Sequence, residues 1–494
     1  MNALIVNLRN VEKRLGAKGI LTVPSLNIYE HERIGIIGNN GVGKTTLLNL
    51  ISGKLLPDKG KIQRQVAFAY YEQISLSDST NAPLDKELLS RFRVPKVASS
   101  KFSGGESAKL RLTQTLSAYE PGLLLDEPTS HLDGNGVNLL VEELRYYYGT
   151  LVVVSHDRYF LDQFATKIWE VANGKVTEYP GNYTKYLALK KAEDAQQQRR
   201  ATDYLKEKKQ LKQALQKKQQ QVTRLKHVTA KQKKRNIQPN RLASSKQKDT
   251  VQKGMQKTAK VIEGKLKRLE VVTKPDQISK VRFTLPQTLE LHNSYPVMGD
   301  KVTVMRGNRT LLKDASFQFA NGQKIAVIGQ NGVGKTTLFE QILENQAGII
   351  LSPKVVFSAY QQLDYQLDSD WSLLRFIEKR SDYSEQMIRS VFHQLGFGQE
   401  ELLKPVGELS GGEKVKVALA VVFLRPANVL ILDEPTNFLD LATIVALEKL
   451  IRAYPGMVIF TSHDRYFVKA SATVIYRIVD KKLNLVESTD TEAY

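Results

Sequence analysis

The sequence predicts an α/β protein in which two similar sheet domains are joined by a long α-helical hairpin linker. Two observations support this fold class: a set of short motifs occurs twice in the same order, and a strongly basic, helix-forming segment separates the two copies. The length of 494 residues has room for roughly two to four domains. A hydrophobic content of 41% is sufficient for buried cores.

The composition excludes several classes of protein. The chain has no cysteine, which excludes disulfides, thiolate metal sites and a cysteine nucleophile. Its apolar runs stay well short of the ~18 residues that a membrane-spanning helix needs. The N-terminal residues lack the apolar core and the cleavage site of a secretory signal. We therefore expect a cytoplasmic protein without a membrane partner.

Four motifs are duplicated. GNNGVGKTT at Gly38–Thr46 recurs as GQNGVGKTT at Gly329–Thr337, SGGE at Ser103–Glu106 recurs at Ser410–Glu413, LLDEPTSHLD at Leu124–Asp133 recurs as ILDEPTNFLD at Ile431–Asp440, and SHDRYF at Ser155–Phe160 recurs at Ser462–Phe467. The last three share an offset of 307 residues, as from His156 to His463. We therefore divide the chain into a first repeat (residues 1–182), a linker (183–296) and a second repeat (297–494).

Continuous apolar runs surround these motifs. RIGIIG and KIAVIG each lead into a glycine-rich loop, and GLLLDEP, VLILDEP, TLVVVSHD and MVIFTSHD are further runs of the same kind. Such runs are typical of parallel strands that are buried on both faces. Each repeat is therefore expected to hold a parallel sheet in which a strand, a glycine-rich loop and a helix follow one another.

The glycine-rich loops predict phosphate binding. A G-x-x-x-x-G-K-T spacing wraps backbone N–H groups around phosphates at a helix N-terminus. Lys44 and Lys335 would reach the β- and γ-phosphates, and the hydroxyls of Thr45 and Thr336 would ligate Mg²⁺. The candidate ATP-binding residues of the two loops are Gly38, Asn39, Asn40, Gly41, Val42, Gly43, Lys44, Thr45 and Thr46, and Gly329, Gln330, Asn331, Gly332, Val333, Gly334, Lys335, Thr336 and Thr337.

A pair of carboxylates ends one apolar run in each repeat. Asp126 and Asp433 suit the hard-oxygen preference of Mg²⁺, reached through its water shell. Glu127 and Glu434 follow directly and are placed to orient or deprotonate an attacking water. The alternative, that these are solvated loop charges, accounts poorly for their position after an apolar strand in both copies.

The order SGGE, LLDEPTSHLD, SHDR resembles the ATP-binding-cassette ATPase domain, over residues 3–180 and 297–485. The resemblance implies two P-loop nucleotide-binding domains that pack head to tail within the chain, so that no further protein subunit is needed. Both sites are expected to hydrolyse ATP, with Glu127 and Glu434 as bases and with His156 and His463 contacting the γ-phosphate. Gln73 and Gln362 would join the Mg²⁺ sites, partly through water. The opposite repeat would complete each site, with Ser410, Gly411 and Gly412 facing the first loop and Ser103, Gly104 and Gly105 facing the second.

Two positions depart from the pattern of this family. Its members usually stack the adenine ring on an aromatic residue before the phosphate loop, where this chain has Leu15 and Arg306. Arg306 can stack through a cation–π contact, whereas Leu15 offers only apolar packing. The contacts to adenine are therefore not predicted by the resemblance.

The linker holds nearly all of the net charge of +21. Residues 185–274 contain 27 Lys and Arg against 7 Asp and Glu, and the rest of the chain holds 45 against 44. Helix formers predominate from Tyr183 to about Val228 and again from about Thr250 to Val272, with Pro239 between them. We expect an antiparallel helical hairpin that binds the phosphate backbone of structured RNA. An exposed coiled coil that only joins the repeats is the alternative.

Two fused cassettes, a charged linker and no membrane segment resemble the ABC-F family of translation-associated ATPases. The resemblance implies a ribosome partner, with the linker inserted from the tRNA exit site toward the peptidyl-transferase centre. Its tip, at about residues 226–245, would then approach large-subunit rRNA and peptidyl-tRNA.

The spacing of the first repeat separates two kinds of ABC-F protein. Housekeeping members often carry an extra arm between the glutamine and the signature, but only 29 residues lie between Gln73 and Ser103. This favours an antibiotic-resistance protein that protects the ribosome. A housekeeping translation factor remains the alternative, followed by the ATPase component of a membrane transporter and, with less support, a DNA-repair ATPase.

Overall fold

The computed structural model describes residues 2–16, 18–72, 85–92, 94, 104–130, 132, 134–234, 244–269, 281–284, 286–361 and 369–486. For residues 104, 105, 222–234, 244–252, 255 and 256 it describes the backbone alone. Gln73, Ser103 and Gln362 lie outside the described residues. The chain forms two compact units, one of Met1–Tyr186 with Ile278–Tyr494 and one of Leu187–Gln277.

The first repeat contains two sheets. The six-stranded sheet has the order β5 (Phe68–Tyr71), β6 (Gly122–Asp126), β7 (Thr150–Val154), β3 (Arg33–Ile37), β8 (Lys167–Ala172) and β9 (Lys175–Pro180). A three-stranded antiparallel sheet has the order β2 (Lys18–Tyr29), β1 (Leu4–Leu15) and β4 (Lys59–Arg64). The described helices are α1 (Lys44–Ser52), α2 (Lys86–Arg91), α3 (Gly104–Leu116), α4 (Gly134–Tyr146) and α5 (Arg158–Phe164).

The second repeat has the same strand order, β14 (Phe357–Tyr360), β15 (Val429–Leu432), β16 (Met457–Phe460), β12 (Lys324–Ile328), β17 (Val474–Val479) and β18 (Lys482–Val486). Its smaller sheet has the order β11 (Arg309–Phe319), β10 (Val297–Arg306) and β13 (Ile349–Leu351). The described α-helices are α8 (Lys335–Leu343), α9 (Leu373–Glu378), α10 (Glu385–Gln394), α11 (Gly411–Leu424), α12 (Leu441–Ala453) and α13 (Arg465–Ser471), and short 3₁₀ turns lie at Gln287–Leu289, Glu401–Leu403 and Val406–Glu408. The matching topologies confirm the predicted α/β fold class.

The apolar motif strands form the centre of each large sheet. Every residue of β6 and β7 is buried, as expected for strands that are covered on both faces. β5, β6, β7, β3 and β8 pair in parallel, and only β9 runs antiparallel. The carboxyl ends of these parallel strands therefore meet at one edge, where ligands bind in open α/β sheets.

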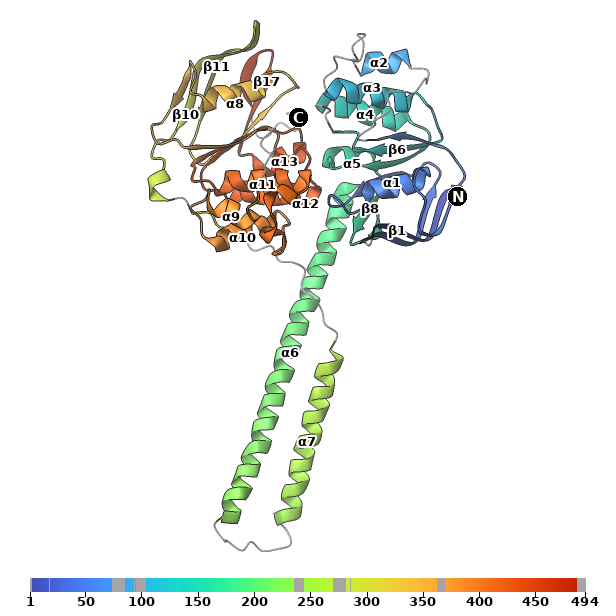
Figure 1. The fold of residues 1–494 in the computed structure, drawn as a ribbon, viewed down its shortest axis with the longest axis vertical. Helices are drawn as coiled ribbons and strands as arrows, with labels where there is room; N and C mark the ends of the chain where they lie inside the picture. Colours follow the sequence, from blue (N-terminus) through green and yellow to red (C-terminus); the bar gives the residue numbers. More distant parts are fainter. Residues whose placement is uncertain are drawn as a thin grey trace. The chain divides into compact units, whose positions relative to one another are not determined.

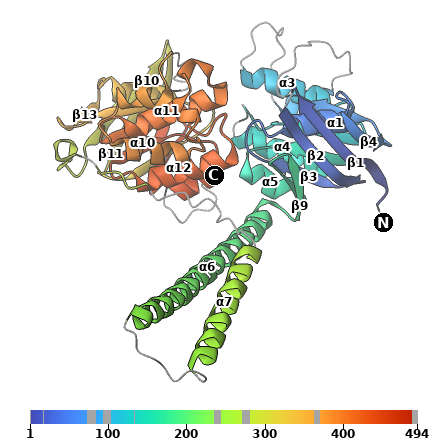
Figure 2. The same cartoon turned by 60° about the horizontal axis from the view of Figure 1, so that its bottom comes forward.

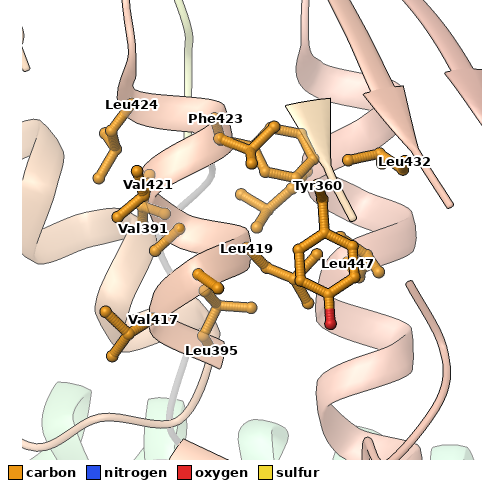
Figure 3. Close-up of a cluster of buried hydrophobic side chains, with 14 of the residues drawn as sticks. Tyr360, Val391, Leu395, Val417, Leu419, Val421, Phe423, Leu424, Leu432 and Leu447 are labelled. Carbon is orange, nitrogen blue, oxygen red and sulfur yellow. The ribbon is translucent and has the colours of Figure 1, made fainter. Parts of the chain in front are cut away.

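The helix that follows the second SGGE motif is fixed by a large apolar core (Figure 3). Ser410 caps α11, and Glu413 completes a capping box with it. Leu419 and Phe423 of α11 lie beside the two neighbouring strands and α12, while Val417 and Val421 face α10. The labelled partners on those elements are Tyr360, Leu432, Leu447, Val391 and Leu395. The signature segment is therefore attached to a rigid element rather than to a free loop.

The linker forms the predicted helical hairpin, in which α6 (Tyr183–Lys234) and α7 (Ser244–Arg268) run antiparallel and side by side (Figure 1, Figure 2). The 52 residues of α6 correspond to about 78 Å of helix. The described part of this helix reaches Lys234, beyond the predicted end at about Val228, because Lys and Gln continue to favour helix. α7 begins at Ser244 rather than at about Thr250 and ends at Arg268 rather than at Val272.

Candidate active sites

Each phosphate loop connects a buried central strand to a helix. β3 leads into the first loop and β12 into the second, and α1 and α8 begin at the loop lysines. The preceding Gly43 and Gly334 adopt φ values of 101° and 108°, which favour glycine. A Cβ on Gly43 would lie 2.6 Å from Cγ2 of Ile20, so β2 also excludes a side chain there. Both loops thus require glycine for the close packing that shapes them.

A buried lysine amine lies inside each loop. Nζ of Lys44 donates to the carbonyl oxygens of Gly38 at 2.8 Å and Asn39 at 3.1 Å. Nζ of Lys335 makes the equivalent bonds to Gly329 at 2.8 Å and Gln330 at 3.2 Å. Burial lowers the pKa of Lys44, and the nearby Glu127 carboxylate opposes that shift. A confined cation that the loop holds in place suits the binding of a polyphosphate.

A hydroxyl and a carboxylate meet beside each lysine. Oγ1 of Thr45 donates to Oδ2 of Asp126 at 2.7 Å, and Oγ1 of Thr336 donates to Oδ2 of Asp433 at 2.6 Å. These oxygens fit Mg²⁺, which is commonly bound through one or two carboxylates together with water and phosphate oxygens. Among the residues that the structure describes, there is no cluster of three or more His, Cys, Asp or Glu side chains that could hold a metal alone. The threonine and the aspartate of each site would thus supply only part of the ligands of such an ion.

The second carboxylate of each pair has an unusual backbone. Glu127 and Glu434 have φ values of 51° and 46°, a conformation that L residues adopt at a cost and that clusters at functional sites. Glu127 is 9% exposed. Burial raises the pKa of Glu127 to about 8 and that of Glu434 to about 7. Both carboxyl groups are thus poised to exchange a proton near neutral pH.

A histidine faces each of these glutamates. Nε2 of His156 lies 3.3 Å from Oε1 of Glu127, and the backbone N–H of His156 donates to Oε2 at 3.2 Å. Nε2 of His463 lies 3.2 Å from Oε1 of Glu434. The amine of each loop lysine is also close to the histidine. Nζ of Lys44 lies 3.1 Å from Nε2 of His156, and Nζ of Lys335 lies 3.3 Å from Nε2 of His463.

Burial, followed by the Lys44 charge, lowers the pKa of His156 to about 3, so the imidazole is neutral at physiological pH. A neutral imidazole can both donate and accept a hydrogen bond, whereas an imidazolium can only donate. Glutamate, histidine and lysine therefore converge on one point at the carboxyl edge of each sheet.

The first loop also contacts the second repeat. The backbone N–H of Asn40 donates to Oδ2 of Asp440 at 3.2 Å, and its side-chain amide donates to the carbonyl oxygen of Phe438 at 3.2 Å. A Cβ on Gly412 would lie 3.7 Å from Nδ2 of Asn40. The structure therefore brings the first loop beside Gly412, near the start of α11. On the opposite side Gly104 and Gly105 begin α3, and Ser103 lies outside the described residues.

A cluster of charged side chains joins the two repeats around Arg158, the residue that follows SHD in the first repeat. The spacing of the sequence motifs does not predict this cluster. Arg158 is 5% exposed and donates to Oε1 of Glu448 at 2.6 Å and Oδ2 of Asp464 at 3.0 Å. The equivalent Arg465 donates to Oδ1 of Asn138 at 3.2 Å. The duplicated SHDR motif signals that the arginines matter, but their partners come from distant parts of the chain.

The two residues at the usual adenine-stacking positions lie at hairpin tips. Leu15 ends β1 and is 66% exposed, and Arg306 ends β10 and is also exposed. Ile20, which packs against Gly43, lies just beyond the first tip.

Models of known protein families match both repeats and part of the linker. A family model described as "ABC transporter" matches residues 21–88 and 312–437, and a second model with the same description matches residues 169–251. No helix in the described part of the chain is long and apolar enough to cross a membrane.

Two relatives align over nearly the whole chain. The erythromycin resistance ATP-binding protein MsrA of Staphylococcus epidermidis is 41% identical over 98% of both chains. The ribosome protection protein VmlR of Bacillus subtilis is 33% identical over 99% of this chain and 90% of its own length. A solved structure of RNase-L Inhibitor aligns with a TM-score of 0.65 at 17% identity, over 95% of this chain and 87% of that one, which is a likeness of fold.

Proposed function

Because the chain belongs to the ABC-F family of ATP-binding-cassette ATPases, we propose that it binds the ribosome and protects it from antibiotics. The chain is an ATPase, and its cassettes bind ATP. The observation that carries the proposal is the 41% identity to an erythromycin resistance protein across both repeats and the linker. We assign nucleotide binding to residues 1–182 and 297–494, and RNA binding to residues 183–296.

The proposed nucleotide sites use the residues at the carboxyl edges of the two sheets. Lys44 and Lys335 exchange their loop carbonyl partners for β- and γ-phosphate oxygens. Thr45 with Asp126, and Thr336 with Asp433, hold Mg²⁺. When bound, the ion supplies charge neutralisation at the phosphates. The contact of Asn40 with Phe438 and Asp440 supports completion of the first site by Gly411 and Gly412 of the second repeat.

Hydrolysis is proposed to begin with a water held by Glu127 or Glu434. The ionised carboxylate accepts a proton from this water as the water oxygen attacks the γ-phosphorus. The bond from that phosphorus to the oxygen bridging to the β-phosphate breaks, so that ADP leaves and inorganic phosphate forms. The neutral imidazole of His156, and the imidazole of His463 in the second site, donate a hydrogen bond toward the transferred phosphoryl group. The strained glutamate backbone fixes the carboxylate against the histidine, 3.3 Å away in the first site. The base is therefore positioned before substrate arrives.

The linker is proposed to act on ribosomal RNA and peptidyl-tRNA. Its surplus of 20 positive charges in residues 185–274 gives a rod that phosphate backbones attract strongly at low salt. ATP-driven closure of the two repeats would favour insertion from the tRNA exit site toward the peptidyl-transferase centre. Hydrolysis would favour release.

Growth under drug challenge tests this function. We expect expression in a susceptible host to raise the erythromycin concentration that the host tolerates. The Glu127→Gln plus Glu434→Gln variant should fail to do so, because it cannot complete the cycle. Unchanged sensitivity with the wild-type chain, despite ribosome binding, would contradict antibiotic protection and favour a housekeeping translation factor.

A further inference from the structure

The first turn of the linker helix has an unusual partner on α5. Oδ1 of Asp162 accepts a hydrogen bond from the backbone N–H of Thr184 at 2.7 Å, and Oδ2 accepts one from its hydroxyl at 2.6 Å. Asn182 separately accepts from the N–H of Lys185 at 3.1 Å. Two side chains thus satisfy free N–H groups at the start of α6, and the charge of Asp162 complements the helix dipole.

Asp162 is also held by the second repeat. The hydroxyl of Tyr466 donates to Oδ2 of Asp162. Burial and this hydrogen bond raise the pKa of Tyr466, so the hydroxyl keeps its proton and acts as a donor. One half-buried carboxylate therefore joins the linker helix to a residue of the other repeat.

Tyr466 belongs to the segment that contacts the second nucleotide site. His463, three residues earlier, lies 3.2 Å from Glu434, and Asp464 accepts from Arg158 of the first repeat. Asp464 also caps α13 through the N–H of Phe467 at 3.0 Å. A displacement of His463 would therefore move Tyr466 with it, because the cap fixes the short segment between them.

The two repeats differ at the position of this carboxylate. The motif SHDRYF is identical in both, but the second residue after it is Asp162 in the first repeat and Lys469 in the second. Lys469 is exposed, and among the described residues β18 is the last element of the second repeat. The carboxylate is thus present in the copy whose final strand leads into the linker.

We propose that Asp162 is a positioning residue that transmits closure of the second nucleotide site, through Tyr466, to the first turn of the linker helix α6. The inference rests on the proposed nucleotide sensing by His463. It predicts that linker movement responds to ATP even when no ribosome is present. By reciprocity, a partner that holds the linker would alter the ATP affinity of the second site by the same factor as ATP alters the affinity for that partner.

Pulsed electron spin resonance between two introduced cysteines tests the coupling, because the native chain has none. Spin labels at Lys175→Cys on β9 and Gln216→Cys on α6 are placed in the Glu127→Gln plus Glu434→Gln background. ATP is expected to shift the distance distribution. Tyr466→Phe and Asp162→Ala should lower the equilibrium constant for that shift about tenfold, as expected for loss of a hydrogen bond to a charged group.

Tyr159→Phe is the matched control, because it removes the same atom at the equivalent position of the first repeat and should leave the shift intact. A fluorescent ATP analogue should still bind Tyr466→Phe, with a loss of affinity no larger than the loss in the equilibrium constant of the shift. An unchanged shift in Tyr466→Phe, no ATP-dependent shift in the parent, or a loss of nucleotide affinity in Tyr466→Phe well beyond tenfold would overturn the proposal. Ribosome binding by the parent is measured separately, so failure of the coupling and failure of the proposed function give different results.

Discussion

Glu127 and Glu434 combine three properties at the scale of the single residue. Each has a left-handed backbone, each is largely removed from solvent, with Glu127 buried and Glu434 half-buried, and each has a raised pKa. Strain and burial are costs to folding, and a carboxylate that is needed only for solubility would not incur them. The same properties in both copies indicate that the chemistry requires them.

Replacing these glutamates with glutamine should alter the pH dependence of stability. A carboxyl group whose pKa is raised on folding contributes stability that is full below the unfolded value of about 4.5 and is lost as pH rises through the folded value. The relevant window therefore runs from about pH 4.5 to 8, given folded pKa values of about 8 and 7.

Without nucleotide, Glu127→Gln plus Glu434→Gln should unfold at a higher temperature than the parent at pH 8.5. The free energy of unfolding should rise by at least ~1 kcal/mol, which is the equivalent of one pKa unit. This rise in the free energy of unfolding should shrink toward pH 5. Calorimetry at the two pH values measures it, and a gain that is equal at both, or larger at pH 5, would contradict the pKa assignment.

At the scale of the element, the linker hairpin is the part of the chain that we propose to bind RNA. Six exposed basic side chains of α6 can be replaced by glutamine, whose helix propensity is close to that of lysine and arginine, so the helix is preserved. They are Arg199, Arg200, Lys206, Lys209, Lys212 and Lys217.

The six-residue variant should bind ribosomes more weakly and with less dependence on salt. The slope of log K against log salt concentration should become shallower by about 0.7–0.9 for each phosphate contact that is lost. The matched control replaces six exposed lysines of the repeats, Lys61, Lys86, Lys175, Lys301, Lys313 and Lys482. Equal slopes for the two variants, measured by sedimentation, would show that the linker is not the RNA-binding element.

At the scale of the whole molecule, the Arg158 cluster ties the repeats together. Its guanidinium lies between Glu448 and Asp464, and these carboxylates raise the pKa of Arg158 despite its burial. The first repeat has Val141 at the position that matches Glu448, so the opposite side lacks this ion pair. The duplicated chain is therefore asymmetric in its cross-repeat contacts.

Arg158→Met should lower stability by about 3–5 kcal/mol, because it leaves the half-buried Asp464 without its cation and the buried Glu448 with only the more exposed Arg452, 3.6 Å away. Arg465→Met should lower the stability much less, since Arg465 donates to the neutral amide of Asn138. Adding Glu448→Val to Arg158→Met should restore part of the loss. Thermal unfolding measures all three variants, and equal effects of the two arginine substitutions would rule out the asymmetry.

The local motifs predict the α/β fold, and they assign Thr45 and Asp126 to one Mg²⁺ site, where the structure places their side chains within hydrogen-bond distance. They could do so because buried parallel strands bring their carboxyl ends to one edge. Arg158 with Glu448, and Asp162 with Tyr466, could not be predicted, since each pair joins residues about 300 positions apart. The sequence pattern also does not predict that α6 extends from Val228 to Lys234, because Val228 is not followed by a breaker residue that would decide where the helix stops.

The central claim is that ATP closes the two repeats and thereby commits the linker to the ribosome. Co-sedimentation of the Glu127→Gln plus Glu434→Gln variant with purified ribosomes tests it most directly. The account predicts that ATP holds this variant on ribosomes in a salt-sensitive manner, and that omitting ATP or neutralising α6 releases it. Equal sedimentation with and without ATP, or none under either condition, would contradict it.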